Sequence, residues 1–276
     1  GVRRPNLEDM SSAATGAAMG EMRDALAAGG IDVCHAFDVR WYNDHVKSEE
    51  LPLSPLPTFG HPNGTLAILL GNSSALWTHF LRWLGAQTDA SLADPLDAYT
   101  TLLIRRAADS LLRALGTSSD IFWVSGEKPD RLVSMQRVAT TSGLCYHDGE
   151  TQLSIHPTFG TWIAFRAVVV IDAPACLGDP PARVPCLLTP AEVVAAREAM
   201  AAALRASDEA NLCTQLHGAK GVEPDVRLAW ARLRDCVEVG REHRYTEAQL
   251  VYHYTKDRAI LAEAMRTACA TTATAL

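Results

Sequence analysis

Residues 154–172 read SIHPTFGTWIAFRAVVVID, and this stretch decides the fold. Between residues 162 and 171 its apolar, aromatic and β-branched residues are too dense for a strand with one wet face, and the run is short for an amphipathic helix. We therefore predict a central strand over residues 162–171 that is covered on both faces. In the preceding turn, Pro157 fixes the backbone and Gly160 leaves it free, as expected for a turn that enters a strand beside a site.

Arg166 is the one charged residue inside this apolar run. A guanidinium keeps its proton at physiological pH, and burying it without a partner costs several kcal/mol. Arg166 therefore needs a carboxylate, either from a neighbouring residue or from a ligand. Judged from this segment alone, a structural salt bridge is slightly favoured.

Further strands are expected on both sides of the central one. Short apolar runs predict buried strands at residues 31–39, 66–70 and 121–124. Residues 144–147 and 153–156 form a predicted hairpin that closes near Asp148-Gly149. Residues 131–142 suit a helix as well as a strand, and their conformation stays undecided.

Helices are expected mainly towards the two ends of the chain. Periodicity and start signals predict helices that end near Ala28, begin after a Ser73 or Ser74 cap, run from Pro95 to Gly116, run from Pro190 to about Gly218, begin after Thr246, and run from Arg258 to Thr267. Thr189 and Glu192 have the spacing of a capping box, as do Thr246 and Gln249. Because the strands gather in the middle without repeated strand–helix units, we predict an α+β fold rather than a doubly wound α/β fold.

The composition is that of an ordinary globular protein, with 48% hydrophobic and 21% charged residues among 276. A net charge of -7 argues against nucleic-acid partners, and no run reaches the roughly 18–20 apolar residues of a membrane span. There is no convincing targeting segment, and the seven cysteines lack C-x-x-C spacing. We therefore expect a cytoplasmic protein with reduced thiols and no membrane partner. We expect a single domain over residues 1–276, with a helical cap from about residue 189.

Several common chemistries are excluded because their motifs are absent. The sequence has no G-x-G-x-x-G after a strand, no G-x-x-x-x-G-K-S/T, no H-E-x-x-H and no G-x-S-x-G. Cys34 and His35 are adjacent, but neighbours in a strand point to opposite faces, so we interpret them as packing residues rather than metal ligands. We expect no metal ligand from the protein.

Distinctive motifs occur in the order typical of one family. They are Trp41-Tyr42-Asn43, Leu92-Ala93-Asp94-Pro95-Leu96-Asp97, Gly143-Leu144-Cys145-Tyr146, Ile155-His156-Pro157-x-Phe159-Gly160-x-Trp162-x-Ala164-x-Arg166, and Arg244-Tyr245-Thr246-Glu247-x-Gln249 with Tyr252. In these motifs, from about Phe37 to Leu261, the chain resembles the cblC-type cobalamin-processing proteins. It departs from their pattern in a shorter hairpin after Tyr146 and in Thr140, which stands in place of a histidine.

The resemblance implies a modified flavin-reductase or nitroreductase fold, with a central, mainly antiparallel sheet flanked by helices. It implies that cobalamin is held base-off without a protein histidine on cobalt, and the sequence indeed lacks a D-x-H-x-x-G motif. The implied activities are glutathione-dependent dealkylation of alkylcobalamins and reductive decyanation of cyanocobalamin, with FMN or FAD as a candidate reductant. Because glutathione supplies the thiol, no catalytic residue of the protein is assigned.

The resemblance also assigns residues to the cobalamin site. The corrin and its nucleotide tail are expected to contact Val133, Ser134, Met135, Gln136, Tyr146, His147, Asp148, Ser154 and Phe165. For Val133, Met135 and Phe165 the sequence alone favours core packing. Gln136 and Ser154 are more informative, because polar groups near a core need partners.

Three arginines are implied to bind the two carboxylates of glutathione, since guanidinium groups pair well with carboxylates. They are Arg166, Arg234 and Arg258, with Arg232 or Arg244 as a replacement for Arg234. The alternative for each C-terminal arginine is a solvated helix face, which is at least as common.

Two other functions stay open at this point. The chain is alternatively a flavin-dependent NAD(P)H reductase or nitroreductase, which would be yellow when purified. It is alternatively a non-enzymatic, chaperone-like cobalamin carrier that turns over nothing. For the cobalamin-processing function, the resemblance implies a downstream cobalamin-trafficking adaptor as a partner and a ligand-induced homodimer.

Overall fold

The computed structural model of the chain describes residues 7–87, 92–125, 131–209 and 224–274. These residues form two compact units, each built from segments that are distant in the sequence. The first unit comprises Gly1–Asn72, Leu96–Ser142 and Phe165–Ala182, and the second comprises Ser73–Pro95, Gly143–Ala164 and Arg183–Leu276. The single domain over residues 1–276, with its helical cap from about residue 189, stays a prediction.

A four-stranded sheet in the order β1-β2-β6-β3 forms the centre of the first unit. The predicted central strand is β6 (Ala164–Pro174), which lies between β2 (Thr65–Asn72) and β3 (Ser119–Trp123), with β1 (Val33–Asp38) beyond β2. β1 pairs with β2, and β3 with β6, in antiparallel register. All of β2 and residues 167–171 of β6 are buried, as their continuous apolar sequence predicts.

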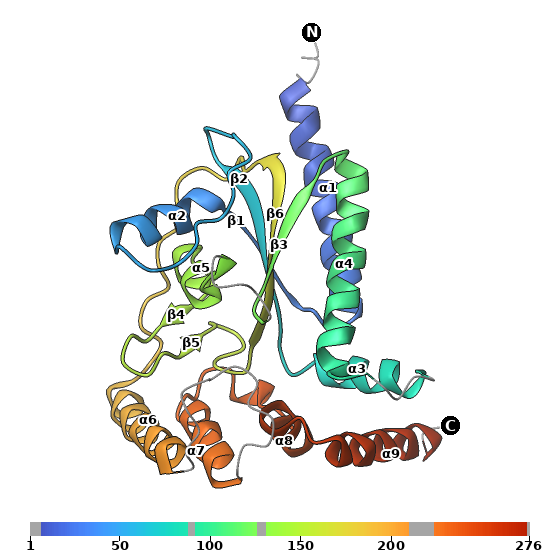
Figure 1. The fold of residues 1–276 in the computed structure, drawn as a ribbon, viewed down its shortest axis with the longest axis vertical. Helices are drawn as coiled ribbons and strands as arrows, with labels where there is room; N and C mark the ends of the chain where they lie inside the picture. The colour runs from blue at the N-terminus through green and yellow to red at the C-terminus, as the bar shows by residue number, and fades with distance from the viewer. Residues whose placement is uncertain (1–6, 88–91, 126–130, 210–223, 275–276) are drawn as a thin grey trace. The chain divides into compact units, whose positions relative to one another are not determined.

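Helices cover both faces of this sheet (Figure 1). α1 (Leu7–Ala28) and α4 (Pro95–Leu115) lie on one face, and α2 (Val39–Ser48) and α5 (Met135–Thr141) lie on the other. The predictions of α1 and α4 are confirmed. With helices around an antiparallel sheet, the predicted α+β class is confirmed as well.

Sequence patterns did not define the other two helices of the first unit. α2 was not predicted, because it begins directly after β1 without an intervening loop. Asp38 ends the strand and caps the helix, since its carboxylate accepts a hydrogen bond from the backbone nitrogen of Arg40 at 2.9 Å. α5 resolves the undecided residues 131–142 as a short helix capped by Ser134.

The second unit contains the predicted hairpin and the C-terminal helices. β4 (Tyr146–His147) and β5 (Ser154–Ile155) pair antiparallel, which confirms the hairpin. The helical elements are α3 (Leu76–Gly85), α6 (Pro190–Glu209), α7 (Pro224–Asp235), η2 (Arg241–His243), α8 (Glu247–Thr255) and α9 (Arg258–Thr274). α7 was not predicted, and the part of the α6 prediction beyond residue 209 lies outside the described residues.

Two predicted helix starts in the second unit have different outcomes. The capping box of α6 is confirmed, since the Thr189 backbone nitrogen donates to the Glu192 carboxylate at 2.7 Å and the Glu192 nitrogen donates to the Thr189 hydroxyl at 3.3 Å. The serine cap of α3 is wrong, because the N-cap is Ala75, which makes no side-chain capping bond. Ser73 instead accepts from the Ala75 nitrogen within the preceding turn.

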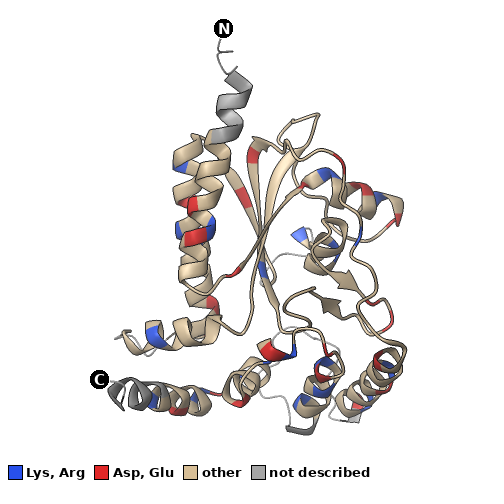
Figure 2. Cartoon of the chain, turned by 180° about the vertical axis from the view of Figure 1, so that it is seen from behind, with Lys and Arg blue, Asp and Glu red and all other residues tan. Residues whose placement is uncertain are grey.

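Charges of both signs are interspersed along the helices of the second unit (Figure 2). Two arginines of its locally basic sequence are paired with acids, Arg241 with Glu238 and Arg244 with Asp235. This basic stretch is therefore partly neutralised. No helix in the described part of the chain combines the length and the apolar character needed to cross a bilayer.

Candidate functional site

The predicted cobalamin-lining stretch, residues 133–136, leads into α5 in the first unit. Val133 and Met135 are buried, with 8% and 4% of their surface exposed. Ser134 caps α5, since its Oγ accepts a hydrogen bond from the backbone nitrogen of Arg137 at 3.4 Å. Ser134 and Gln136 are only half-buried. The two apolar side chains thus pack into the unit, while the two polar residues keep part of their surface exposed.

Arg166 extends from β6 in the same unit, next to half-buried Phe165. Its side chain is 12% exposed, and its Nη1 lies 3.7 Å from the carboxylate of Asp97, in the first turn of α4. Its Nε donates to the Asn72 Oδ1 at 2.7 Å. The carboxylate partner that Arg166 was expected to need is therefore present, but the ion pair is long and the short hydrogen bond goes to a neutral amide.

The hairpin of the second unit carries four predicted site residues. His147 stands directly opposite Ser154 in the ladder, so their side chains project from the same face. The Ser154 hydroxyl is buried and has no hydrogen-bond partner among the described residues. Buried polar groups are nearly always satisfied, so this hydroxyl is an unusual feature of the unit.

Asp148 and Tyr146 lie on the same hairpin and hydrogen-bond to each other at 3.4 Å. The Asp148 carboxylate also accepts from the Thr151 nitrogen at 2.9 Å and from the Thr151 hydroxyl at 2.5 Å. Burial alone would raise the pKa of Asp148, but these hydrogen bonds outweigh it and hold the pKa below its ordinary value. A hydrogen bond with Cys186, together with burial, raises the pKa of Tyr146. The hairpin therefore presents an ionised Asp148 and a protonated Tyr146 at neutral pH.

Cys145 directly precedes this hairpin strand and is completely buried. Burial raises the pKa of its thiol to about 12. The thiolate form is the reactive one, so Cys145 is not a nucleophile at neutral pH. It packs instead as a small apolar side chain.

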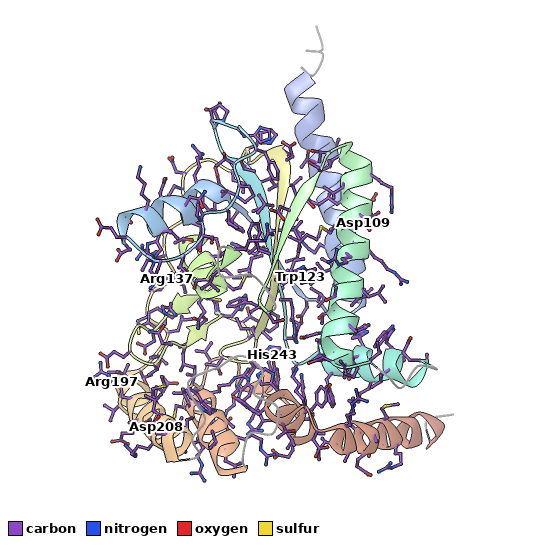
Figure 3. The ribbon with its side chains drawn as sticks, in the orientation of Figure 1. Asp109, Trp123, Arg137, Arg197, Asp208 and His243 are labelled. Carbon is purple, nitrogen blue, oxygen red and sulfur yellow. The ribbon has the colours of Figure 1, made fainter. Side chains whose placement is uncertain are left out.

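The turn at residues 156–160 is held by backbone contacts that tolerate only glycine. A Cβ on Gly160, whose φ is +56°, would lie 1.8 Å from the Val239 carbonyl oxygen. A Cβ on Gly240, whose φ is +74°, would lie 2.2 Å from the Phe159 carbonyl carbon. Phe159 also stacks on His156 and meets His243, labelled in Figure 3, with ring centroids 4.8 Å apart in both pairs. The distinctive His-Pro-x-Phe-Gly motif thus forms a tightly packed turn.

Arg234 of α7 is buried within the second unit, with 9% of its surface exposed. Its Nε and Nη2 both donate to the Thr161 carbonyl oxygen, at 3.1 and 2.7 Å. Its guanidinium lies 4.3 Å from the ring centroid of Trp162 and 4.6 Å from that of Tyr245. Arg234 therefore fastens the segment that leads into β6 to α7.

The remaining candidate arginines have other environments. Arg258 is exposed at the start of α9 and donates to the Leu92 carbonyl oxygen. Arg244 forms a two-point pair with Asp235 at 2.6 and 2.9 Å. Arg232 is exposed on α7. Arg234 and Arg258 thus belong to the same unit but have separate partners.

The structure brings some predicted residues together and adds others. On the hairpin, it gathers all four predicted residues, which are Tyr146, His147, Asp148 and Ser154. Asn72 and Asp97 were missed as partners of Arg166. Asp97 had a signal in the acidic helix start, whereas Asn72 at the end of β2 had none. Among the described residues, no group of three or more His, Cys, Asp or Glu side chains could hold a metal ion.

Comparison with known proteins gives a family and a fold. Residues 30–210 match the profile of the MMACHC family, described as the methylmalonic aciduria and homocystinuria type C family. A zebrafish (Danio rerio) protein named cyanocobalamin reductase / alkylcobalamin dealkylase is 30% identical in an alignment 165 residues long, which covers 54% of this chain and 62% of that protein. The chain thus spans less than two thirds of this relative.

Two solved structures share the fold. A B12-trafficking protein CblC from C. elegans superposes with a TM-score of 0.62 at 17% identity, over 87% of this chain and 92% of that one. Selenomethionine-labelled epoxyqueuosine reductase superposes with a TM-score of 0.51 at 11% identity, over 84% of this chain and 68% of that one. The predicted nitroreductase-like fold is confirmed by both.

Proposed function

Because the chain belongs to the MMACHC family, as its match over residues 30–210 shows, we propose that it is a cobalamin-processing enzyme. It binds cobalamin base-off and removes the upper axial ligand, by glutathione-dependent dealkylation of alkylcobalamins and by reductive decyanation of cyanocobalamin. Both activities are in the name of the zebrafish relative, and we extend them to this chain. A reduced flavin, FMN or FAD, is the proposed electron donor for decyanation.

The observation that carries the proposal is the buried hydroxyl of Ser154, which has no partner among the described residues. Leaving such a group unsatisfied costs about 1–3 kcal/mol, so a ligand that supplies a partner gains that stabilisation. The corrin ring carries amide side chains, which offer both donors and acceptors. Half-buried His147, opposite Ser154, and Tyr146 and Asp148 beside it provide further polar contacts on the same hairpin.

The proposed dealkylation needs an external thiol. The sulfur of glutathione forms a bond to the alkyl carbon while the cobalt–carbon bond breaks, and both electrons of that bond stay on cobalt. The products are a thioether and cob(I)alamin, and the thiol proton is released to solvent. Cys145 cannot substitute for glutathione, because burial raises its pKa to about 12. The protein contributes orientation and binding energy.

Arg166 is the proposed anchor for a glutathione carboxylate. The carboxylate that compensates its charge lies 3.7 Å away and is 46% exposed, so water can solvate it when another carboxylate takes its place, whereas the guanidinium is 12% exposed and continues to need a partner. A substrate carboxylate can therefore replace Asp97 at small cost. Arg258 is exposed and donates to the Leu92 carbonyl, whereas Arg234 is buried and would have to share its guanidinium with the Thr161 carbonyl.

An anaerobic absorbance titration with methylcobalamin, before and after addition of glutathione, tests the proposal. We expect a shift to the base-off spectrum on mixing, followed by conversion to cob(I)alamin when the thiol is added. A base-off shift without conversion would favour the carrier. No shift, together with a yellow protein that oxidises NAD(P)H, would favour the flavin-dependent reductase.

The cellular context is proposed from the family resemblance. We place the enzyme in the cytoplasm, upstream of a cobalamin-trafficking adaptor, and propose that ligand binding induces a homodimer. Size-exclusion chromatography with and without methylcobalamin tests the dimer. An unchanged elution volume at saturating ligand would argue against it.

A further inference from the structure

The motif Trp41-Tyr42-Asn43 lies in α2. The function proposed for the protein has not yet assigned a role to this motif. Tyr42 is completely buried. Its hydroxyl accepts a hydrogen bond from the backbone nitrogen of Ser134 at 3.3 Å. Burial raises the pKa of Tyr42 despite the opposing effects of the Ser134 amide and Arg137, so the phenol stays protonated at neutral pH. Tyr42 thus holds the backbone of the stretch that is proposed to line cobalamin.

Asn43 reaches the same stretch through the proline-rich loop that follows α2. Its side-chain amide pairs with both backbone groups of Leu56, since Nδ2 donates to the carbonyl at 2.8 Å and Oδ1 accepts from the nitrogen at 2.8 Å. In the same loop the Ser54 nitrogen donates to the Leu132 carbonyl at 2.9 Å. Leu132, the residue just before the lining stretch, is therefore bonded to a loop that Asn43 holds in place.

Two arginines anchor the flanks of the stretch within the first unit. Arg131 forms a two-point pair with Asp120 of β3, at 3.0 and 2.9 Å. Arg137, labelled in Figure 3 on α5, places its Nη1 3.1 Å from the His45 Nε2 of α2. Arginine can only donate, so the His45 Nε2 is the acceptor in this pair. Residues 131–137 are therefore held at several points before any ligand binds.

We infer that Tyr42 is a positioning residue, which presets residues 133–136 in the conformation that receives cobalamin. The inference rests on the proposed function. Tyr42 acts on the backbone of the lining stretch itself, whereas Asn43 and Arg131 act on positions beside it. A stretch that is fixed in advance loses less conformational entropy on binding, so the loss of this anchor lowers affinity for cobalamin.

The test compares Tyr42→Phe with Tyr99→Phe. Tyr99 is also buried, in the same unit, and its hydroxyl donates to the Gly29 carbonyl at 2.9 Å, so it is a matched control. Each variant keeps the ring and loses one hydrogen bond made by the hydroxyl of a buried tyrosine, and we expect similar decreases in Tm. We expect Tyr42→Phe alone to weaken methylcobalamin binding, by about tenfold in Kd, and Tyr99→Phe to change it by less than about twofold.

Hydrogen exchange gives a second readout that does not depend on cobalamin. The Ser134 amide should exchange faster in Tyr42→Phe than in the wild type, and at the wild-type rate in Tyr99→Phe. Unchanged Kd in Tyr42→Phe, or equal loss of affinity in both variants, overturns the positioning role while the proposed function stands. A wild-type protein that binds no cobalamin overturns the proposed function, and the positioning role with it.

Discussion

Arg166 and Arg234 are both largely buried guanidinium groups, but their charges are compensated in different ways. Arg166 in the first unit has an amide partner, Asn72, and an ion-pair partner, Asp97, that is 3.7 Å away and 46% exposed. Arg234 in the second unit is bonded twice to a backbone carbonyl and lies between the rings of Trp162 and Tyr245. In the described part of the chain Arg234 forms no ion pair.

This difference separates a group that can exchange its partner from one that cannot easily do so. Water can solvate a half-exposed carboxylate when it leaves, which supports the proposal that Arg166 binds the carboxylate of a substrate. The partners of Arg234 include a main-chain oxygen and two aromatic rings, which do not move without disturbing the core. The family resemblance treats both arginines alike, whereas from their environments we propose a binding role for Arg166 and a stabilising role for Arg234.

The largest expected effect is on stability, from Arg234→Met. The substitution removes two hydrogen bonds to Thr161 and the contacts with both rings, so we expect a loss of roughly 2–4 kcal/mol in the free energy of unfolding. Denaturant unfolding followed by tryptophan fluorescence measures it. Arg232→Met is the matched control, because Arg232 is exposed on the same helix, and we expect it to change stability by less than about 0.5 kcal/mol. Equal stability of the two variants would contradict the structural role of Arg234.

Arg166→Gln should show the opposite pattern. We expect glutathione-dependent dealkylation to fall by at least about tenfold, while cobalamin affinity changes by less than about twofold, because the lost interaction is with the thiol substrate. Anaerobic single-turnover absorbance and a binding titration separate the two effects. Arg105→Gln is the control, since Arg105 is exposed on α4 and its guanidinium lies over the ring of Trp123 at 5.4 Å. Equal loss of binding and turnover in Arg166→Gln would rule out the anchor.

Ser154→Ala extends the comparison to a neutral group. Removing a buried hydroxyl that has no partner among the described residues should leave the ligand-free protein unchanged or stabilise it by about 1 kcal/mol. The same change should weaken methylcobalamin binding by roughly threefold to tenfold. Thermal unfolding without ligand measures the change in stability, and thermal unfolding with methylcobalamin measures the loss of binding. A destabilised ligand-free variant would mean that the hydroxyl has a structural partner.

The elements that sequence predicted correctly carry their signals locally. The apolar run of β6, the capping box of Thr189 with Glu192 and the hairpin around Asp148 each lie within a few residues. α2 and α5 carry no such local signal, because α2 begins directly after the last residue of β1 and α5 is short and rich in β-branched residues. Tertiary packing decides their conformation.

The site residues stay a prediction, and their partners in the structure were not predictable from the sequence. Arg166 was recognisable from its place in an apolar run, but Asn72 lies 94 residues away and only the sheet brings them together. The isolation of the Ser154 hydroxyl depends on every neighbour of the hairpin, so no short pattern encodes it. The role of Tyr42 is hidden for the same reason, since its partner Ser134 lies 92 residues away.

The smallest expected effect comes from Asp97→Asn, and it separates the two interpretations of Arg166 most directly. If Asp97 is an exchangeable partner, its removal frees the guanidinium for the carboxylate of glutathione, and the KM for glutathione should decrease by about twofold to threefold at constant cobalamin affinity. If Arg166 is structural, the variant should lose stability and show an unchanged or higher KM. Raising the salt concentration should weaken glutathione binding in both proteins while narrowing the difference between them, because screening reduces the competition from a half-exposed carboxylate.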